Sequence, residues 1–198
     1  AVEATNGTIV VQIRNNNPAN RSETLQTESS DGGKTWPEYV ITSNDPQNKV
    51  FHWDQRPGVL ADGRILNLFW SYDKQAGAYL NIHARESTDN GRTWSPMWDT
   101  GVPGQPAAPV SMPDGKVAMV HVNRTSAPAI EMRTSDDMGR TWPEETRMVL
   151  YDAGTDSQTR KKTTMQDAWA EIGNYSVGNN VSEVLPDVGD LQACSVSC

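Results

Sequence analysis

Side chains that could bind an anion or transfer a proton are spread over the whole chain. Arginine presents a planar guanidinium that binds a carboxylate through two hydrogen bonds, and a carboxyl group can act as general acid or base. Residues of these types, with one Gln and one Tyr, fall in segments that we expect to be loops or strand ends: Arg14, Asp54, Arg56, Asp73, Gln105, Arg124, Glu171 and Tyr175. Because they are far apart in sequence, only the fold could bring them together.

One octapeptide pattern, S-x-D-x-G-x-T-W, occurs three times and organises the chain. The copies are box 1 (residues 29–36), box 2 (87–94) and box 3 (135–142). In each, the Asp carboxylate can accept hydrogen bonds from backbone amides of a turn, and the Gly supplies a positive φ. We expect Thr and Trp to begin a new strand and the Trp to wedge between neighbouring sheets. The defining residues are Asp31, Gly33, Trp36, Asp89, Gly91, Trp94, Asp137, Gly139 and Trp142.

Each box belongs to a unit of four short strands. The dipeptides Asn6-Gly7, Asp62-Gly63 and Asp114-Gly115 are hairpin-turn signals, and a β-rich run follows each. Antiparallel four-stranded units recurring roughly every 50 residues are typical of a β-propeller. We therefore predict an all-β fold, a single partial β-propeller domain over residues 1–198. Its blades are predicted at about 6–45 (without an inner strand), 50–100, 104–152 and 170–198, the last with only its first two strands.

The boxes resemble the Asp-box, or BNR repeat, of the sialidase (neuraminidase) superfamily. Residues 54–70 and 104–115 also resemble segments of bacterial sialidase-like proteins. The resemblance covers roughly residues 6–195. It implies a six-bladed propeller, of which this chain would hold three to three and a half blades, and it favours a secreted or periplasmic location. In the family the boxes are structural turns far from the active site, and they also occur in propellers that are not sialidases.

The resemblance also implies where chemistry would take place. The hairpin turns and boxes should lie at one end of each blade, and the loops at the other end should carry the ligand. A sialidase binds the substrate carboxylate with arginines, uses an Asp as general acid/base, and uses a Tyr activated by a Glu as nucleophile. Mapped by position, the catalytic candidates are Asp54, Glu171 and Tyr175, and the substrate-binding candidates are Arg56, Arg124, Arg14, Asp73 and Gln105.

Two functions from different classes remain open. One is a sialidase-like glycoside hydrolase that removes a terminal sialic acid or a similar acidic sugar. The other is a non-catalytic propeller that binds glycans or acts as a scaffold. The Phe/Tyr-Arg-Ile-Pro motif of sialidases is absent, which argues against activity of this chain alone. The unpaired blade edges predict self-association.

Composition and motifs exclude several other classes. The 198 residues carry a formal net charge of −8, which argues against nucleic acid or an anionic membrane surface as partner. No apolar run approaches the roughly 18 residues of a membrane helix, and residues 1–6 show no signal peptide.

The sequence also gives no reason to expect a metal or a cofactor. No phosphate loop, nucleophile elbow or zinc motif is present. The spacing of Cys194 and Cys198 is not that of a metal knuckle, and the three histidines are isolated. A calcium loop is the weaker interpretation of the boxes, because they lack a terminal bidentate Glu.

Overall fold

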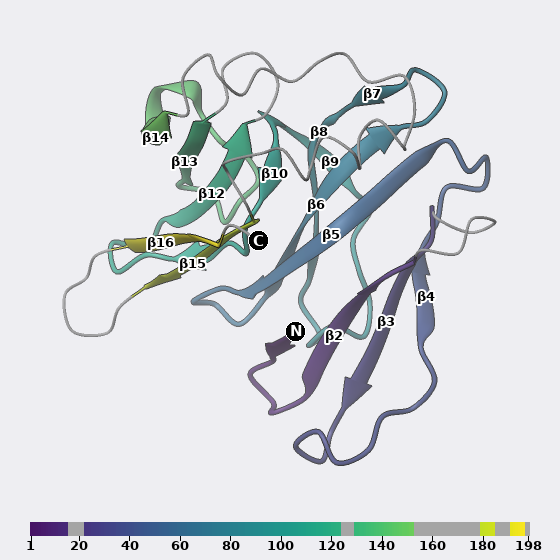
Figure 1. Ribbon diagram of the computed structural model, residues 1–198. Coiled ribbons are helices and arrows are strands. Elements are labelled where there is room, and N and C mark those ends of the chain that lie inside the picture. The colour runs from purple at the N-terminus through teal and green to yellow at the C-terminus, as the bar shows by residue number, and fades with distance from the viewer. Residues whose placement is uncertain (16–21, 124–128, 153–178, 185–190, 197–198) are drawn as a thin grey trace.

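The computed structural model describes residues 1–15, 22–123, 129–152, 179–184 and 191–196. These residues form three antiparallel sheets and one hairpin, and the second sheet lies between the first and third (Figure 1). Apart from one 3-10 turn at Glu144–Thr146, the described elements are all strands. The fold is thus a partial β-propeller made of four-stranded antiparallel blades.

The strands of each sheet follow one another in sequence. Sheet 1 contains β1 (Val2–Glu3), β2 (Ile9–Arg14), β3 (Thr24–Ser29) and β4 (Val40–Ser43). Sheet 2 contains β5 (Val50–Val59), β6 (Ile65–Asp73), β8 (Asn81–Ser87) and β9 (Trp98–Pro103), with β7 (Ala78–Tyr79) paired to β6. Sheet 3 contains β10 (Gln105–Pro106), β12 (Val117–Asn123), β13 (Ala129–Ser135) and β14 (Met148–Asp152), with β11 (Val110–Ser111) paired to β12. Sheet 4 is the hairpin of β15 (Asn179–Val184) and β16 (Leu191–Val196).

Sheet 1 differs from the sequence prediction at its inner edge. We predicted that the first blade lacks an inner strand, but β1 pairs with β2 through Val2 opposite Val10 and Glu3 opposite Ile9. The strand was missed because it is only two residues long and shows no apolar alternation. The two predicted strands of the fourth unit are present as β15 and β16, and the turn between them lies outside the described residues.

The predicted hairpin turns form at all three sites. The side-chain oxygens of Asn6, Asp62 and Asp114 each accept a hydrogen bond from the backbone N–H two residues later, at 3.1 Å. The glycine that follows has a φ between 82° and 87° in every case. This left-handed conformation is one that glycine adopts without a Cβ clash, which explains the dipeptide signal.

The boxes form closed turns around the Asp carboxylate. In box 1, Asp31 accepts hydrogen bonds from the backbone N–H of Thr35 at 3.0 Å and from its hydroxyl at 2.6 Å. The Ser29 hydroxyl accepts the N–H of Gly33 at 2.9 Å, and boxes 2 and 3 repeat these bonds. The hydrogen bonds from Thr35 hold the pKa of Asp31 well below its usual range. The boxes are thus self-contained turns.

One detail of the box prediction is wrong. Thr and Trp do not begin the next strand, because the Thr is bound to the Asp carboxylate. The following strands begin at Val40, Trp98 and Met148, four or six residues after the box Trp.

The box tryptophans differ in how far they are buried. Trp142 is 4% exposed and packs in the apolar core between sheets 2 and 3, and Trp94 packs against the small cluster between sheets 1 and 2. These two confirm the predicted wedge. Trp36 is 44% exposed, so the wedge prediction is wrong for box 1 within the described part of the chain. Its indole N–H donates to the carbonyl of Gly33 instead, at 2.9 Å.

Candidate functional site

A β-bulge in β5 sets the position of Asp54. Trp53 lies opposite Trp70 and Arg56 opposite Leu68, so β5 contains one extra residue over this stretch. Asp54 has a φ of 48°, in the left-handed region that non-glycine residues avoid. Such a conformation costs on the order of 1–3 kcal/mol and persists where the surrounding structure enforces it. The bulge changes the direction of the Asp54 side chain relative to a regular strand.

Asp54 is hydrogen-bonded to side chains from both neighbouring sheets. Arg14, the last residue of β2, donates from Nη1 to Asp54 Oδ1 at 3.2 Å. Gln105, the first residue of β10, donates from Nε2 to Asp54 Oδ2 at 3.0 Å. The side chains of Arg14 and Asp54 are 22% and 21% exposed, so solvent reaches this ion pair. The structure therefore joins three of the predicted site residues, from three sheets, in one cluster.

The bulge is also attached to sheet 1 through its next residue. Gln55 Nε2 donates to the backbone carbonyl of Ile13 at 3.0 Å. This bond and the Arg14–Asp54 pair connect the end of β2 to the bulge at two successive residues. The position of Asp54 thus depends on how sheets 1 and 2 pack.

An aromatic cluster supports the cluster of polar residues. Trp53 precedes Asp54, and the Arg14 guanidinium lies 5.1 Å from the centre of its ring. Trp53 stacks on Tyr72, with ring centres 5.8 Å apart, and packs with Phe51 and Trp70. Sequence reasoning did not identify this cluster. The apolar alternation in β5 and β6 could have revealed it, because the two strands pair Trp53 with Trp70 and Phe51 with Tyr72.

Two predicted site residues lie nearby without joining the cluster. Arg56 follows the bulge, and its Nε is buried with no hydrogen-bond partner among the described residues. Asp73 lies at the end of β6, opposite Val50. At about 3.3 Å per strand residue, it is roughly 13 Å from Asp54 along the sheet. Its Oδ1 accepts the N–H groups of Gln75 and Ala76 at 2.8 and 2.9 Å, so it closes a turn.

The remaining predicted site residues, Arg124, Glu171 and Tyr175, lie outside the described residues. Their contribution to the site stays a prediction. Among the residues that the structure does describe, no group of three His, Cys, Asp or Glu side chains could hold a metal ion. The same described residues include no helix long and apolar enough to span a membrane.

The structure resembles solved β-propellers, although no family model and no curated protein matches the sequence. A protein of unknown function from Dyadobacter fermentans is 21% identical, with a TM-score of 0.60 over 75% of this chain and 40% of that one. The α-L-arabinanase of Penicillium chrysogenum, solved with arabinobiose, is 15% identical, with a TM-score of 0.59 over 96% of this chain and 54% of that one. The intramolecular trans-sialidase of Ruminococcus gnavus, solved with oseltamivir carboxylate, is 20% identical, with a TM-score of 0.50 over 84% of this chain and 31% of that one.

These likenesses support the fold and not a particular reaction. The identities are low, and fold alone does not determine function. The chain spans between 31% and 54% of the length of these three structures. The two named enzymes act on different sugars, so the chemistry of this chain has to be argued from its own residues.

Proposed function

We propose that this chain is part of a propeller glycoside hydrolase and that Asp54 lies at its sugar-binding mouth. The observation that carries the proposal is the strained bulge, which holds a solvent-accessible carboxylate between donors from two other sheets. Strained backbone of this kind is concentrated at functional sites. The likeness to a trans-sialidase and an arabinanase agrees with a sugar as ligand.

The proposed substrate is a glycan that ends in sialic acid or a similar acidic sugar. The substrate carboxylate would bind to Arg14, with Arg56 and Arg124 as further candidates, because guanidinium groups bind carboxylates bidentately. Gln105 would keep the Asp54 carboxyl group in place. Asp54 would donate a proton to the leaving glycosidic oxygen as that bond breaks, and would then take a proton from the attacking water.

The proposed nucleophile is Tyr175, activated by Glu171. As Glu171 takes the phenolic proton, the phenolic oxygen would attack the anomeric carbon and displace the glycosidic oxygen that Asp54 protonates, forming a glycosyl-enzyme bond. Water would then cleave this bond, and Glu171 would return the proton to the tyrosine.

A non-catalytic glycan-binding module is the second candidate. It is favoured by the fact that both oxygens of Asp54 already accept hydrogen bonds, from Arg14 and Gln105. A carboxylate held in this way could serve only to tie three sheets together. Binding of a glycan without turnover would support this alternative.

Hydrolysis of fluorogenic substrates tests the proposal. We would incubate the chain with a fluorogenic sialoside and, separately, with a fluorogenic arabinofuranoside. Turnover of the sialoside should fall by at least about 100-fold in Asp54→Asn, the size expected for a lost general acid/base. The control is Asp136→Asn, an exposed carboxylate at the opposite end of the sheets whose only ion pair within the described residues is with Lys116. Equal rates in the unsubstituted chain and Asp54→Asn would refute the catalytic proposal, and binding of the sialoside without turnover above buffer would favour the non-catalytic module.

A further inference from the structure

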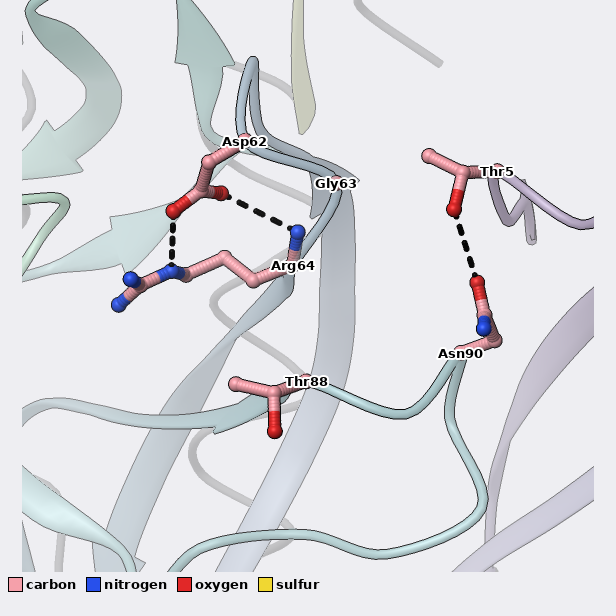
Figure 2. A pocket seen from close by; sticks show the side chains of 6 residues that line it. All are labelled: Thr5, Asp62, Gly63, Arg64, Thr88 and Asn90. Atoms are coloured by element: carbon pink, nitrogen blue, oxygen red, sulfur yellow. Dashed lines mark hydrogen bonds and ion pairs between the residues drawn. The ribbon is translucent and has the colours of Figure 1, made fainter.

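Two pockets meet at Asn90, at the end of the molecule opposite to Asp54. The first, of about 270 Å³, is lined by Thr5, Asp62, Gly63, Arg64, Thr88 and Asn90 (Figure 2). The second, of about 290 Å³, is lined in part by Thr8, Glu28, Asn90 and Arg92. Thr8 lies just before β2 and Arg14 at its far end, so the length of a strand separates these pockets from the Asp54 cluster. Both belong to the junction of sheets 1 and 2, which we call interface 1/2.

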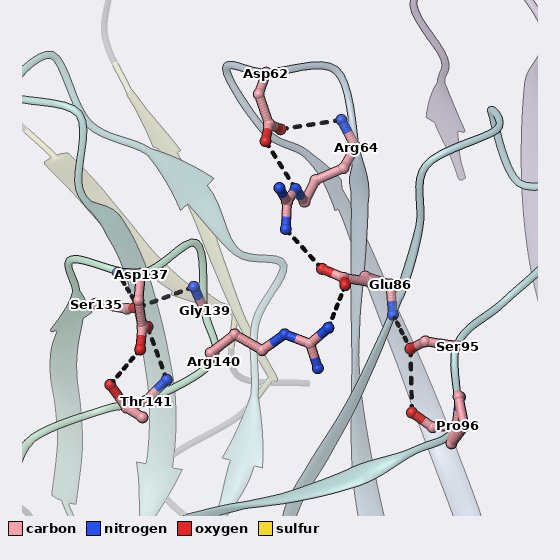
Figure 3. Close-up of polar contacts among 10 residues, drawn as sticks. All are labelled: Asp62, Arg64, Glu86, Ser95, Pro96, Ser135, Asp137, Gly139, Arg140 and Thr141. Atoms are coloured by element: carbon pink, nitrogen blue, oxygen red, sulfur yellow. Dashed lines mark hydrogen bonds and ion pairs between the residues drawn. The ribbon is translucent and has the colours of Figure 1, made fainter.

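The corresponding place between sheets 2 and 3, interface 2/3, is filled by an ion network. Glu86 accepts a hydrogen bond from Arg64 Nη1 at 2.9 Å and another from Arg140 (Figure 3). The Arg140 guanidinium also lies 4.2 Å from the ring centre of Trp98. One carboxylate and two guanidinium groups thus close the space between a hairpin turn and box 3.

Interface 1/2 has residues at the three equivalent positions of the repeat, but they do not form such an ion network within the described chain. Thr8 follows a hairpin glycine as Arg64 does, Glu28 precedes a box serine as Glu86 does, and Arg92 follows a box glycine as Arg140 does. Threonine therefore replaces the first arginine. Among the described residues, the side chains of Glu28 and Arg92 have no hydrogen-bond or ion-pair partner, and both line the second pocket.

The two boxes nevertheless sit on their neighbouring sheets in the same way. A Cβ on Gly91 of box 2 would lie 2.9 Å from a methyl carbon of Val10, and one on Gly139 of box 3 would lie 2.4 Å from a methyl carbon of Leu66. Val10 and Leu66 both come three residues after a hairpin glycine. The open pocket therefore comes from threonine at position 8, where interface 2/3 has Arg64, and not from a different placement of the box on its neighbouring sheet.

The lining of the two pockets fits a neutral ligand rich in hydroxyl groups. Each pocket contributes one carboxylate and one guanidinium, Asp62 with Arg64 and Glu28 with Arg92, so neither favours a net charge. Glu28 can only accept hydrogen bonds and Arg92 can only donate them, and a sugar hydroxyl can satisfy both.

Asn90 contributes a further donor between the two pockets. It has a φ of 62°, where box 1 has Gly32, and its Oδ1 accepts the Thr5 hydroxyl at 3.0 Å. Its amide nitrogen has no hydrogen-bond partner in the part of the chain that is described, and the Thr88 hydroxyl has none either. Both groups line the first pocket (Figure 2).

We propose that interface 1/2 carries a second sugar-binding site, in which the hydroxyls of a neutral sugar bridge Glu28 and Arg92 and extend past Asn90. This site is independent of the proposed reaction at Asp54, because it uses none of the same residues. It would hold a neutral part of a glycan at a distance from the mouth.

Chemical-shift mapping of the ¹⁵N-labelled chain tests this site. The probes are D-galactose, L-arabinose and N-acetyl-D-glucosamine, each titrated separately into the full chain. At least one should produce saturable shifts at Thr8, Glu28, Asn90 and Arg92. Arg92→Ala should weaken that binding by at least about tenfold, because it removes a charged hydrogen-bond donor. Lys34→Ala, the same position in the exposed box 1, should leave it unchanged.

A second variant fills the pocket instead of removing a side chain that binds the sugar. Thr8→Arg would place an arginine where interface 2/3 has Arg64, and it should abolish the shifts by pairing with Glu28. If Thr8→Arg does not fold, the exposed Arg92→Ala decides the question alone. The proposal is wrong if none of the three sugars gives saturable shifts at these residues. It is equally wrong if a folded Arg92→Ala or Thr8→Arg chain binds as tightly as the parent.

Discussion

Interface 2/3 and interface 1/2 occupy equivalent positions in the repeat but are held together by different chemistry. Interface 2/3 has an apolar core that includes Leu66, Leu68, Val117, Met119 and Trp142, with the Glu86 ion network at its edge. The side chains of this core are apolar, so dispersion and apolar burial stabilise it.

Interface 1/2 is polar at its centre. The buried Arg85 donates to Gln12 at 3.2 Å and to Thr42 at 2.9 Å. Its guanidinium stacks over Trp94, 4.4 Å from the ring centre, and the Trp94 indole N–H donates to Gln26 at 2.9 Å. Burial lowers the pKa of Arg85 to about 9, and no carboxylate pairs with it among the described residues.

This difference agrees with the proposal that the two interfaces serve different purposes. An interface stabilised by apolar packing keeps two sheets in a fixed relation. An interface stabilised by specific hydrogen bonds leaves polar groups at its surface that can bind a ligand. Asp54 is hydrogen-bonded to side chains across both interfaces, to Arg14 on one side and Gln105 on the other. The position of the Asp54 side chain therefore depends on the packing of both interfaces.

The largest effect is expected from truncating the side chain under each box. Leu66→Ala should lower the free energy of unfolding by about 3–5 kcal/mol, because it removes a fully buried side chain from the core of interface 2/3. Val10→Ala, at the equivalent position of interface 1/2, should cost roughly 2 kcal/mol, since fewer carbons are lost from a smaller cluster. Urea unfolding monitored by tryptophan fluorescence measures both. Equal losses would contradict the contrast between the two cores.

Acid should destabilise the protein through two histidines, the half-buried His52 and the buried His121. Burial lowers the pKa of His52, next to Arg85, to about 4, and burial likewise lowers the pKa of His121 in sheet 3 to about 4. The unfolded chain takes up protons below about pH 6.5 while the folded chain stays neutral down to about pH 4, so stability present above pH 6.5 is lost as the pH falls. At pH 5 the loss should be on the order of 2 kcal/mol per histidine.

The contribution of His52 can be separated from that of His121. His52→Gln should flatten the pH dependence of the urea midpoint between pH 7 and pH 5, because the variant has one group fewer to titrate. A slope that does not change would show that His52 is not kept neutral by burial.

A smaller effect on stability should distinguish the Glu86 ion network of interface 2/3 from Glu28 of interface 1/2, which is unpaired among the described residues. Glu86→Gln should cost about 1–3 kcal/mol, since Glu86 is 11% exposed and accepts hydrogen bonds from two arginines. The matched variant Glu28→Gln should change stability by less than about 0.5 kcal/mol, because this carboxylate has no partner in the described structure. Thermal unfolding of the two variants side by side gives the difference. If Glu28→Gln were as costly as Glu86→Gln, the second pocket would be closed in solution.

Local features of the fold could be predicted because their interactions are local. The hydrogen bonds of a box join residues within four positions of each other, such as Asp31 and Thr35, so the pattern itself encodes the turn. The hairpin glycines are encoded in the same way. The short strand β1 could not be predicted, because it depends on pairing with β2 and not on its own residues.

The candidate site could be predicted in part. The topology correctly placed Arg14, Asp54 and Gln105 at the same end of neighbouring sheets. The bulge at Asp54 has no sequence signal, because neither glycine nor a turn dipeptide marks it. The buried Arg85 was also missed, because its partners Gln12 and Thr42 belong to another sheet. The difference between Thr8 and Arg64 is visible in the repeat, but only the structure shows that Arg64 binds Glu86 and that Thr8 lines an open pocket.

The central claim is that Arg14, Asp54 and Gln105 form one sugar-binding mouth across three sheets. Titration of the ¹⁵N-labelled chain with N-acetylneuraminic acid tests it most directly. We predict saturable shifts at these three residues, lost in Arg14→Ala and retained in Arg92→Ala, whose substitution lies at the opposite end of the sheets. Shifts that are absent at the mouth, or that persist unchanged in Arg14→Ala, would contradict the claim.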